Sequence, residues 1–190
     1  MIRRFLKRVK QHQTSEDLAI GSSGQVNRTL NILRTDTQSG ALGDVLEFLP
    51  GLALHTDPQM NIHGSYASPI GRLLEIKASM DAPGEWCALH ISLPVSDLTH
   101  YGIVGFSARF SAGSTDVIRA CLRSGTGDNF QDRFFDKHLL LRPEEASHLD
   151  ALFVHHIDGV PIKSDWRELI LFLPVQNFEL SLIDLRVFVV

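Results

Sequence analysis

The stretch Val104-Gly105-Phe106-Ser107-Ala108-Arg109-Phe110-Ser111 alternates an apolar residue with a small or polar one. Successive side chains of a β-strand point to opposite faces, so this stretch predicts a strand with one buried face and one solvated face. The same alternation recurs on both sides of it, in residues 74–79, 87–93 and 118–123. Strands with one wet face are typical of antiparallel sheets.

The C-terminal third of the chain is more apolar and adds two signals. Residues 151–163, with Asp158-Gly159 in their middle, predict a β-hairpin, because Asp-Gly tolerates the positive φ angles of a tight turn. Residues 169–173 and 178–190 read as two more strands. In the second of them the apolar phase changes near Ile183-Asp184, which predicts a β-bulge or bend there.

With 45–54 also counted as a strand, the sequence predicts about nine strands and no long helix beyond the N-terminal arm. Alternating β and α units are absent, which excludes doubly wound and TIM-type folds. The predicted fold is all-β: a two-sheet antiparallel β-sandwich, jelly-roll-like, with a short N-terminal amphipathic helix or arm. We expect 1–43 to form a basic arm and polar lead-in, with a short helix or strand around 26–33, and 44–190 to form the sandwich.

Composition restricts the functional classes. A chain of 190 residues, 44% hydrophobic and 21% charged, is ordinary for one soluble globular core. Its formal net charge of -4 gives no reason to expect a nucleic-acid partner. Cys87 and Cys121 are too few for a disulfide scaffold.

The first ten residues carry their own signal. Ile2, Phe5, Leu6 and Val9 recur at helical spacing, while Arg3 and Arg4, with three further basic residues, fill the other positions. Docking on its own domain, anchoring to a protein scaffold or an anionic membrane, and fraying in solvent all stay open. No long apolar run follows, so we expect no secretory signal and no transmembrane segment, and a location in the cytoplasm or in an assembled particle.

The run from Asp165-Trp166 to Pro174, followed by Phe178-Glu179-Leu180-Ser181-Leu182, resembles the closing strands of jelly-roll carbohydrate-binding modules. In such modules a Trp often precedes the penultimate strand. The resemblance covers the final third of the chain and implies a non-catalytic, lectin-like sandwich that binds a glycan or polysaccharide. The chain departs from secreted members of that group because it shows no signal peptide.

Aromatic side chains at strand ends are the first candidates for such a site, because a pyranose ring packs its C–H face on an aromatic ring. Each of them is equally suited to plug the end of a core. The segment 124–136 is the second candidate, a polar loop pinned by Phe134 or Phe135. The candidate ligand-binding residues are Trp86, Trp166, Tyr66, Tyr101, Asp128, Asn129 and Arg133.

Calcium is the one cofactor that the residues suggest. Asp128, Asp132 and Asp136 offer oxygen ligands, although their spacing is not that of an EF-hand loop. We otherwise expect no cofactor.

Two alternatives to glycan binding stay open. The first is a structural or assembly subunit, such as a spike, decoration or fibre-base protein of a phage-like particle, held by its N-terminal arm. The second is an iron- and oxoglutarate-type oxygenase, with His55-Thr56-Asp57, then His155 or His156, then Arg167 in the required order. One His-x-Asp match is expected by chance, and no Gly-x-Ser-x-Gly elbow occurs, so we predict a non-enzyme. Exposed sheet edges also allow a homo-oligomer.

Overall fold

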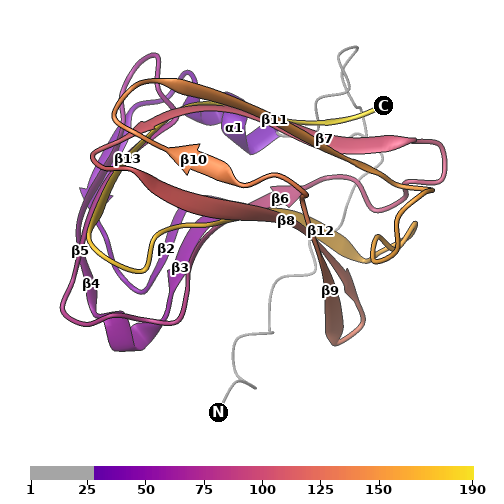
Figure 1. Ribbon diagram of the computed structural model, residues 1–190, viewed down its shortest axis with the longest axis horizontal. Coiled ribbons are helices and arrows are strands. Elements are labelled where there is room, and N and C mark those ends of the chain that lie inside the picture. The colour runs from indigo at the N-terminus through magenta and orange to yellow at the C-terminus, as the bar shows by residue number, and fades with distance from the viewer. Residues whose placement is uncertain (1–27) are drawn as a thin grey trace.

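The computed structural model describes residues 28–190, which form two antiparallel sheets packed face to face (Figure 1). A short helix, α1 (Arg28–Leu33), precedes the sheets, and a 3-10 turn, η2 (Pro58–Met60), links β3 to β4. The six-stranded sheet has the order β1 (Gln38–Ala41), β4 (Ile62–Ser68), β5 (Leu74–Met80), β13 (Phe178–Val189), β7 (Ile103–Ala112) and β11 (Ala146–Phe153). The seven-stranded sheet has the order β10 (Leu139–Leu141), β8 (Asp116–Thr126), β12 (Trp166–Phe172), β6 (Cys87–Leu93), β3 (Leu52–Thr56) and β2 (Val45–Leu49), with β9 (Asn129–Phe134) also paired to β8.

The core lies between the two sheets and follows the alternation of the sequence. In β7, Val104, Phe106, Ala108 and Phe110 are all buried, as predicted. The corresponding residues of the other alternating strands are buried as well, which confirms the all-β sandwich. They are Leu74, Ile76 and Ala78 in β5, Cys87, Leu89, Ile91 and Leu93 in β6, and Ile118, Ala120 and Leu122 in β8.

The predicted irregularity in the last strand is confirmed. The pairing of β13 with β7 shifts by one residue between Leu182 and Asp184. The inserted residue moves every later side chain of β13 to the opposite face of the sheet. Leu182 and Leu185, which are three residues apart, therefore both point into the core. The bulge therefore lets one long strand keep its apolar side chains inside along its whole length.

The chain enters the fold earlier than residue 44. Leu30 and Leu33 of α1 are 0% and 2% exposed, and Arg34 donates hydrogen bonds to Asp184 and to the carbonyl of Leu185. β1 pairs with β4 from Gln38 to Ala41. The polar lead-in of the sequence thus supplies one helix and one edge strand, because a few buried leucines suffice to hold a short helix against a core.

The predicted hairpin over 151–163 is wrong. β11 ends at Phe153 and pairs with β7, while 160–163 contribute only an isolated bridge between Lys163 and Asp97. The carbonyls of Pro161 and Ile162 instead accept hydrogen bonds from the buried guanidinium of Arg167. Proline also lacks the N–H that a ladder would need. Gly159 still takes a positive φ of 90°, but in a loop.

The segment 124–136 is likewise not an open loop. Its residues form the β8–β9 hairpin, in which Gly127 takes a φ of 58° at the first position of the two-residue turn. Phe135 is buried against Phe106 at the end of the hairpin, which confirms one of the two expected anchors. In Figure 1, β9 extends away from both layers on the side opposite the six-stranded sheet.

The arm residues proposed to contact a partner, Ile2, Arg3, Arg4, Phe5, Leu6 and Val9, lie outside the described residues. Within 28–190, no helix has the length and apolar character required to cross a membrane.

Because α1 is anchored by a fully buried leucine, Leu30→Ala is expected to lower the free energy of unfolding by about 2–5 kcal/mol. Ile32→Ala, in the same helix but at a residue that is 45% exposed, is the matched control and is expected to change it by roughly 0.5 kcal/mol or less. Urea denaturation of the three proteins measures both values. Equal effects of the two substitutions would mean that α1 is not part of the core.

Candidate functional site

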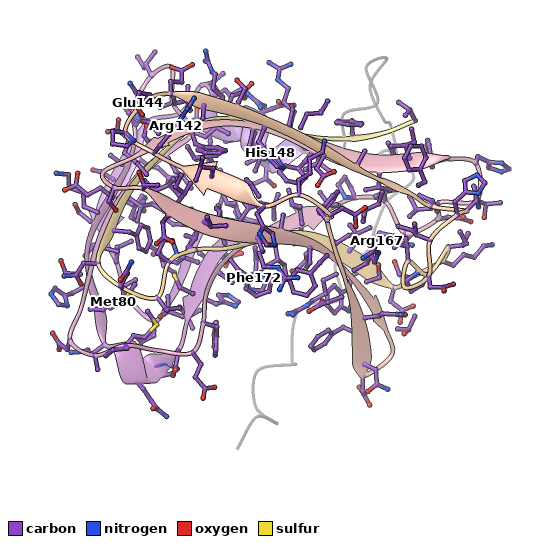
Figure 2. The ribbon with its side chains drawn as sticks, viewed as in Figure 1. Met80, Arg142, Glu144, His148, Arg167 and Phe172 are labelled. Carbon is purple, nitrogen blue, oxygen red and sulfur yellow. The ribbon has the colours of Figure 1, made fainter. Side chains whose placement is uncertain are left out.

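The face of the seven-stranded sheet that points away from the core carries most of the distinctive side chains of this protein. We call it the outer face. Figure 2 shows Phe172 on this side of the sheet, opposite the six-stranded layer. By strand alternation and register it comprises Phe130, Asp132 and Phe134 of β9, Arg119, Cys121, Arg123 and Gly125 of β8, Trp166, Glu168, Ile170 and Phe172 of β12, and Ala88, His90 and Ser92 of β6.

A small apolar cluster is buried on the outer face, separate from the main core. Cys121 and Ile170 are 0% exposed and Ala88 is 2% exposed. Phe134 and Phe172 pack against this cluster and stack on each other, with ring centroids 5.6 Å apart. The two rings therefore form a half-exposed lid, and burial beneath it raises the pKa of the Cys121 thiol to about 12.

A second aromatic group lies at the other end of the outer face. Trp166 is paired with Gly125, which in turn is paired with Phe130. A Cβ added to Gly125 would lie 2.0 Å from Cε2 of Trp166, so the indole rests directly on the glycine backbone. Phe130 is 53% exposed, and Trp166 is half-buried. The backbone of Gly125 therefore lies between the side chains of Trp166 and Phe130.

The polar groups of the outer face are held by one another. Arg123 donates two hydrogen bonds of 2.6 Å to Asp132, and its guanidinium lies 4.0 Å from the ring centroid of Phe130. His90 Nδ1 lies 2.9 Å from Glu168 Oε2, and the ring of His55 lies against that of His90 at 4.6 Å. Paired groups of this kind are fixed in direction and still offer hydrogen-bonding atoms to a ligand.

The structure distributes the predicted aromatic candidates over different places. Trp166 lies on the outer face. Trp86, 39% exposed, directly precedes β6, at the far end of the β6–β12 pair and about 26 Å from Trp166 by strand rise. Tyr66 packs edge-on against Phe48 and the core, and Tyr101 also packs on the core. Of these four side chains, only that of Trp166 lies on the outer face.

The predicted polar candidates are not brought together either. Asp128 and Asn129 lie at the exposed tip of the β8–β9 hairpin. Arg133 points to the opposite side of β9 from Phe134 and forms an ion pair with Asp136, whereas Asp132 is bound to Arg123.

Neither metal hypothesis gains support from the described residues. Among 28–190, no group of three or more His, Cys, Asp or Glu side chains could hold a metal ion. Asp57 accepts hydrogen bonds from the backbone N–H of Glu85 and of Gln59, and these bonds lower the pKa of its carboxyl group. Arg167 points inward and is 1% exposed, and burial lowers its pKa to about 10. His155 and His156 are exposed in the loop after β11.

Sequence reasoning missed most of the outer face. It did not single out Phe130, Phe172, Arg119 or Arg123, and it expected Phe134 or Phe135 to serve as a core anchor. The alternation Phe130-Gln131-Asp132-Arg133-Phe134 was the available signal, since a strand through these residues places both phenylalanines on one face.

Because Phe134 lies opposite Cys121 in the β8–β9 register, Phe134→Ala is expected to open the cluster to water. The pKa of the Cys121 thiol then falls toward its ordinary value, and the thiol becomes reactive. Alkylation of the native protein near neutral pH, followed by mass spectrometry, should detect modified Cys121 and unmodified Cys87. Phe153→Ala, on the other sheet, should leave both thiols protected. If Cys121 stays unreactive in Phe134→Ala, Phe134 does not shield this thiol from solvent.

Gly125→Ala is expected to displace the indole of Trp166, because its Cβ would overlap the ring. In a Trp86→Phe background, the tryptophan bands of the near-ultraviolet circular dichroism spectrum come from Trp166 alone, and they should change. Gly43→Ala is the matched control, because a Cβ at Gly43 meets no atom within 4 Å. The same spectrum for all three proteins would show that the ring does not rest on Gly125.

Several solved structures with a similar fold are carbohydrate-binding modules. A module described as CBM4 superposes with a TM-score of 0.50 at 13% identity, over 74% of this chain and 96% of that one. The CBM22-1 xylan-binding domain from Paenibacillus barcinonensis gives a TM-score of 0.49 at 12% identity, over 83% and 90%. The family 30 module of a cellulosomal cellulase of Clostridium thermocellum gives 0.48 at 11% identity, over 88% and 94%.

No protein-family model matches the sequence, and no curated protein matches it. The superposition with CBM4 and the two-sheet topology show that the chain has the jelly-roll sandwich fold of carbohydrate-binding modules, at low sequence identity. The resemblance of its C-terminal third predicted this fold.

Proposed function

We propose that this protein binds a glycan chain along its outer face, without catalysis. The observation that carries the proposal is the gathering of four aromatic side chains on one solvent-facing surface. Trp166 and Phe130 lie at one end of it, and Phe134 and Phe172 lie over the apolar cluster. Outward-pointing positions of a wet sheet face are usually polar, so these rings call for a functional explanation.

Sugar chemistry suits this surface. A pyranose ring presents an apolar C–H face that packs on an aromatic ring, while its hydroxyls require a few fixed hydrogen-bonding groups. The rings supply the first requirement. The Arg123–Asp132 and His90–Glu168 pairs, which lie between the two aromatic groups, supply the second. Strands hold all of these groups in register, so little order has to be created on binding.

The fold adds support of a general kind, because the similar CBM4 structure belongs to a class named for carbohydrate binding. The two carboxylates of the outer face, those of Asp132 and Glu168, are each held by a partner side chain. That arrangement suits recognition of hydroxyl groups.

Phe130→Ala and Trp166→Ala are each expected to weaken binding to a glycan selected from an array by roughly 10- to 30-fold, since each removes a stacking ring. Calorimetric titration with that glycan measures the loss. Phe153→Ala is the matched control: Phe153 is 54% exposed, against 53% for Phe130, but it lies on the six-stranded sheet.

All three variants should keep the far-ultraviolet circular dichroism of the unmodified protein, because each replaced ring is at least partly exposed. If Phe153→Ala reduces affinity as much as Phe130→Ala does, the site is not the outer face. If the array gives no binding at all, the proposed function itself fails.

A further inference from the structure

One cation on the outer face is left without an acidic partner. Arg119 lies opposite Phe172 in the β8–β12 register, is exposed, and places its guanidinium carbon 3.9 Å from the ring centroid of Phe134. No carboxylate of the described residues lies within ion-pair distance of it, in contrast to Arg123, which is bound to Asp132. Arg119 therefore lies over the ring of Phe134, which itself stacks on Phe172, and keeps N–H groups available.

The stacking determines how Arg119 presents its charge. The ring of Phe134 covers one side of the Arg119 guanidinium, and the N–H donors that do not face the ring stay available to a ligand. Carboxylates accept two such parallel hydrogen bonds, which is the geometry that arginine recognises best. A stacked arginine also loses less side-chain freedom on binding than a solvated one.

The charge of the surrounding surface supports the same conclusion. Asp132 and Glu168, the two acidic residues of the outer face, are each neutralised or hydrogen-bonded by a partner. Glu47, on β2, lies four strands from β8, about 19 Å away at the usual strand spacing. An anion placed at Arg119 therefore meets a positive charge, while the two carboxylates of the outer face are already occupied by Arg123 and His90.

We infer that the glycan bound by the outer face is acidic, with sugars that carry carboxylate groups, and that Arg119 determines this specificity. The inference rests on the proposed function and adds the chemical class of the ligand. The sugar ring packs on Phe172, beside the Arg119–Phe134 pair, and Arg119 binds the carboxylate of that ring or of its neighbour. A neutral polysaccharide has no carboxylate for Arg119 and would contact only the aromatic rings.

The test compares short uronic-acid oligosaccharides with the same compounds after methyl esterification, which removes the charge and keeps the sugar. Oligomers of galacturonate, of alginate and of hyaluronan are the probes. Short oligomers are chosen because the N-terminal residues include several arginines and lysines, which would gain multivalent contacts with a long polyanion. Calorimetry on the full chain gives the affinities.

We expect at least one acid form to bind roughly 10- to 100-fold more tightly than its ester, and Arg119→Gln to remove that difference. Arg142→Gln is the matched control, because Arg142 is also exposed and forms no ion pair with any of the residues 28–190, yet lies well away from Phe172 (Figure 2). It should leave the difference intact. The preference for the acid form should also weaken as salt increases.

Equal affinity for acid and ester forms overturns the inference, as does an acid preference that survives Arg119→Gln. Binding of dextran sulfate without binding of any uronic-acid oligomer overturns it too, because the ligand would then be a sulfate. In each case, if a glycan still binds and Phe130→Ala weakens that binding, the proposed function stands and only the acidic specificity is lost.

Discussion

The central constraint on this protein is that the middle of its seven-stranded sheet is apolar on both faces. On β12, Leu169 and Leu171 point into the main core, while Ile170 between them points the other way and is nonetheless fully buried. A buried isoleucine on a solvent-facing surface requires a cover, because leaving it wet forfeits about 1.5–3 kcal/mol of burial free energy. Phe134 and Phe172 provide that cover.

The aromatic surface follows from this requirement. Phe134 is available only because β9 pairs with β8 and brings its alternate residues over the sheet. The same hairpin then carries Phe130 to the other end of the face, beside Trp166. The rings that bury Cys121 and Ile170 expose their outer sides, so the groups that stabilise the sheet are also the groups that we propose to contact sugar.

β12 also links the outer face to the loop that precedes it. Trp166 and Arg167 are neighbours in sequence and therefore point to opposite faces of the strand. Arg167 reaches inward to Ser124 Oγ and to the carbonyls of Pro161 and Ile162, which fixes the loop. Ser124, which accepts a hydrogen bond from Arg167, is next to Gly125, on which the indole of Trp166 packs. The same segment of β8 therefore contacts both side chains.

The residue pattern by itself determined the all-β sandwich, the inward residues of five strands and the bulge in β13, because alternation has a period of two and any slip exposes an apolar row. It could not determine the hairpins. Asp158-Gly159 is compatible with a tight turn. In the fold, however, the carbonyls of Pro161 and Ile162 accept hydrogen bonds from the buried Arg167, and no hairpin forms there. The polar, glycine-containing 124–136 segment suggested a loop, yet pairing with β8 made it a strand.

The outer face was decided only by tertiary structure. Trp166 could be identified as a candidate from its position before an apolar run, since that is a local feature. Phe130, Phe134, Phe172 and Arg119 could not, because what makes them a surface is the register between β9, β8 and β12. Which strands pair, and with what offset, depends on contacts between residues distant in the chain, and a local pattern carries no record of them.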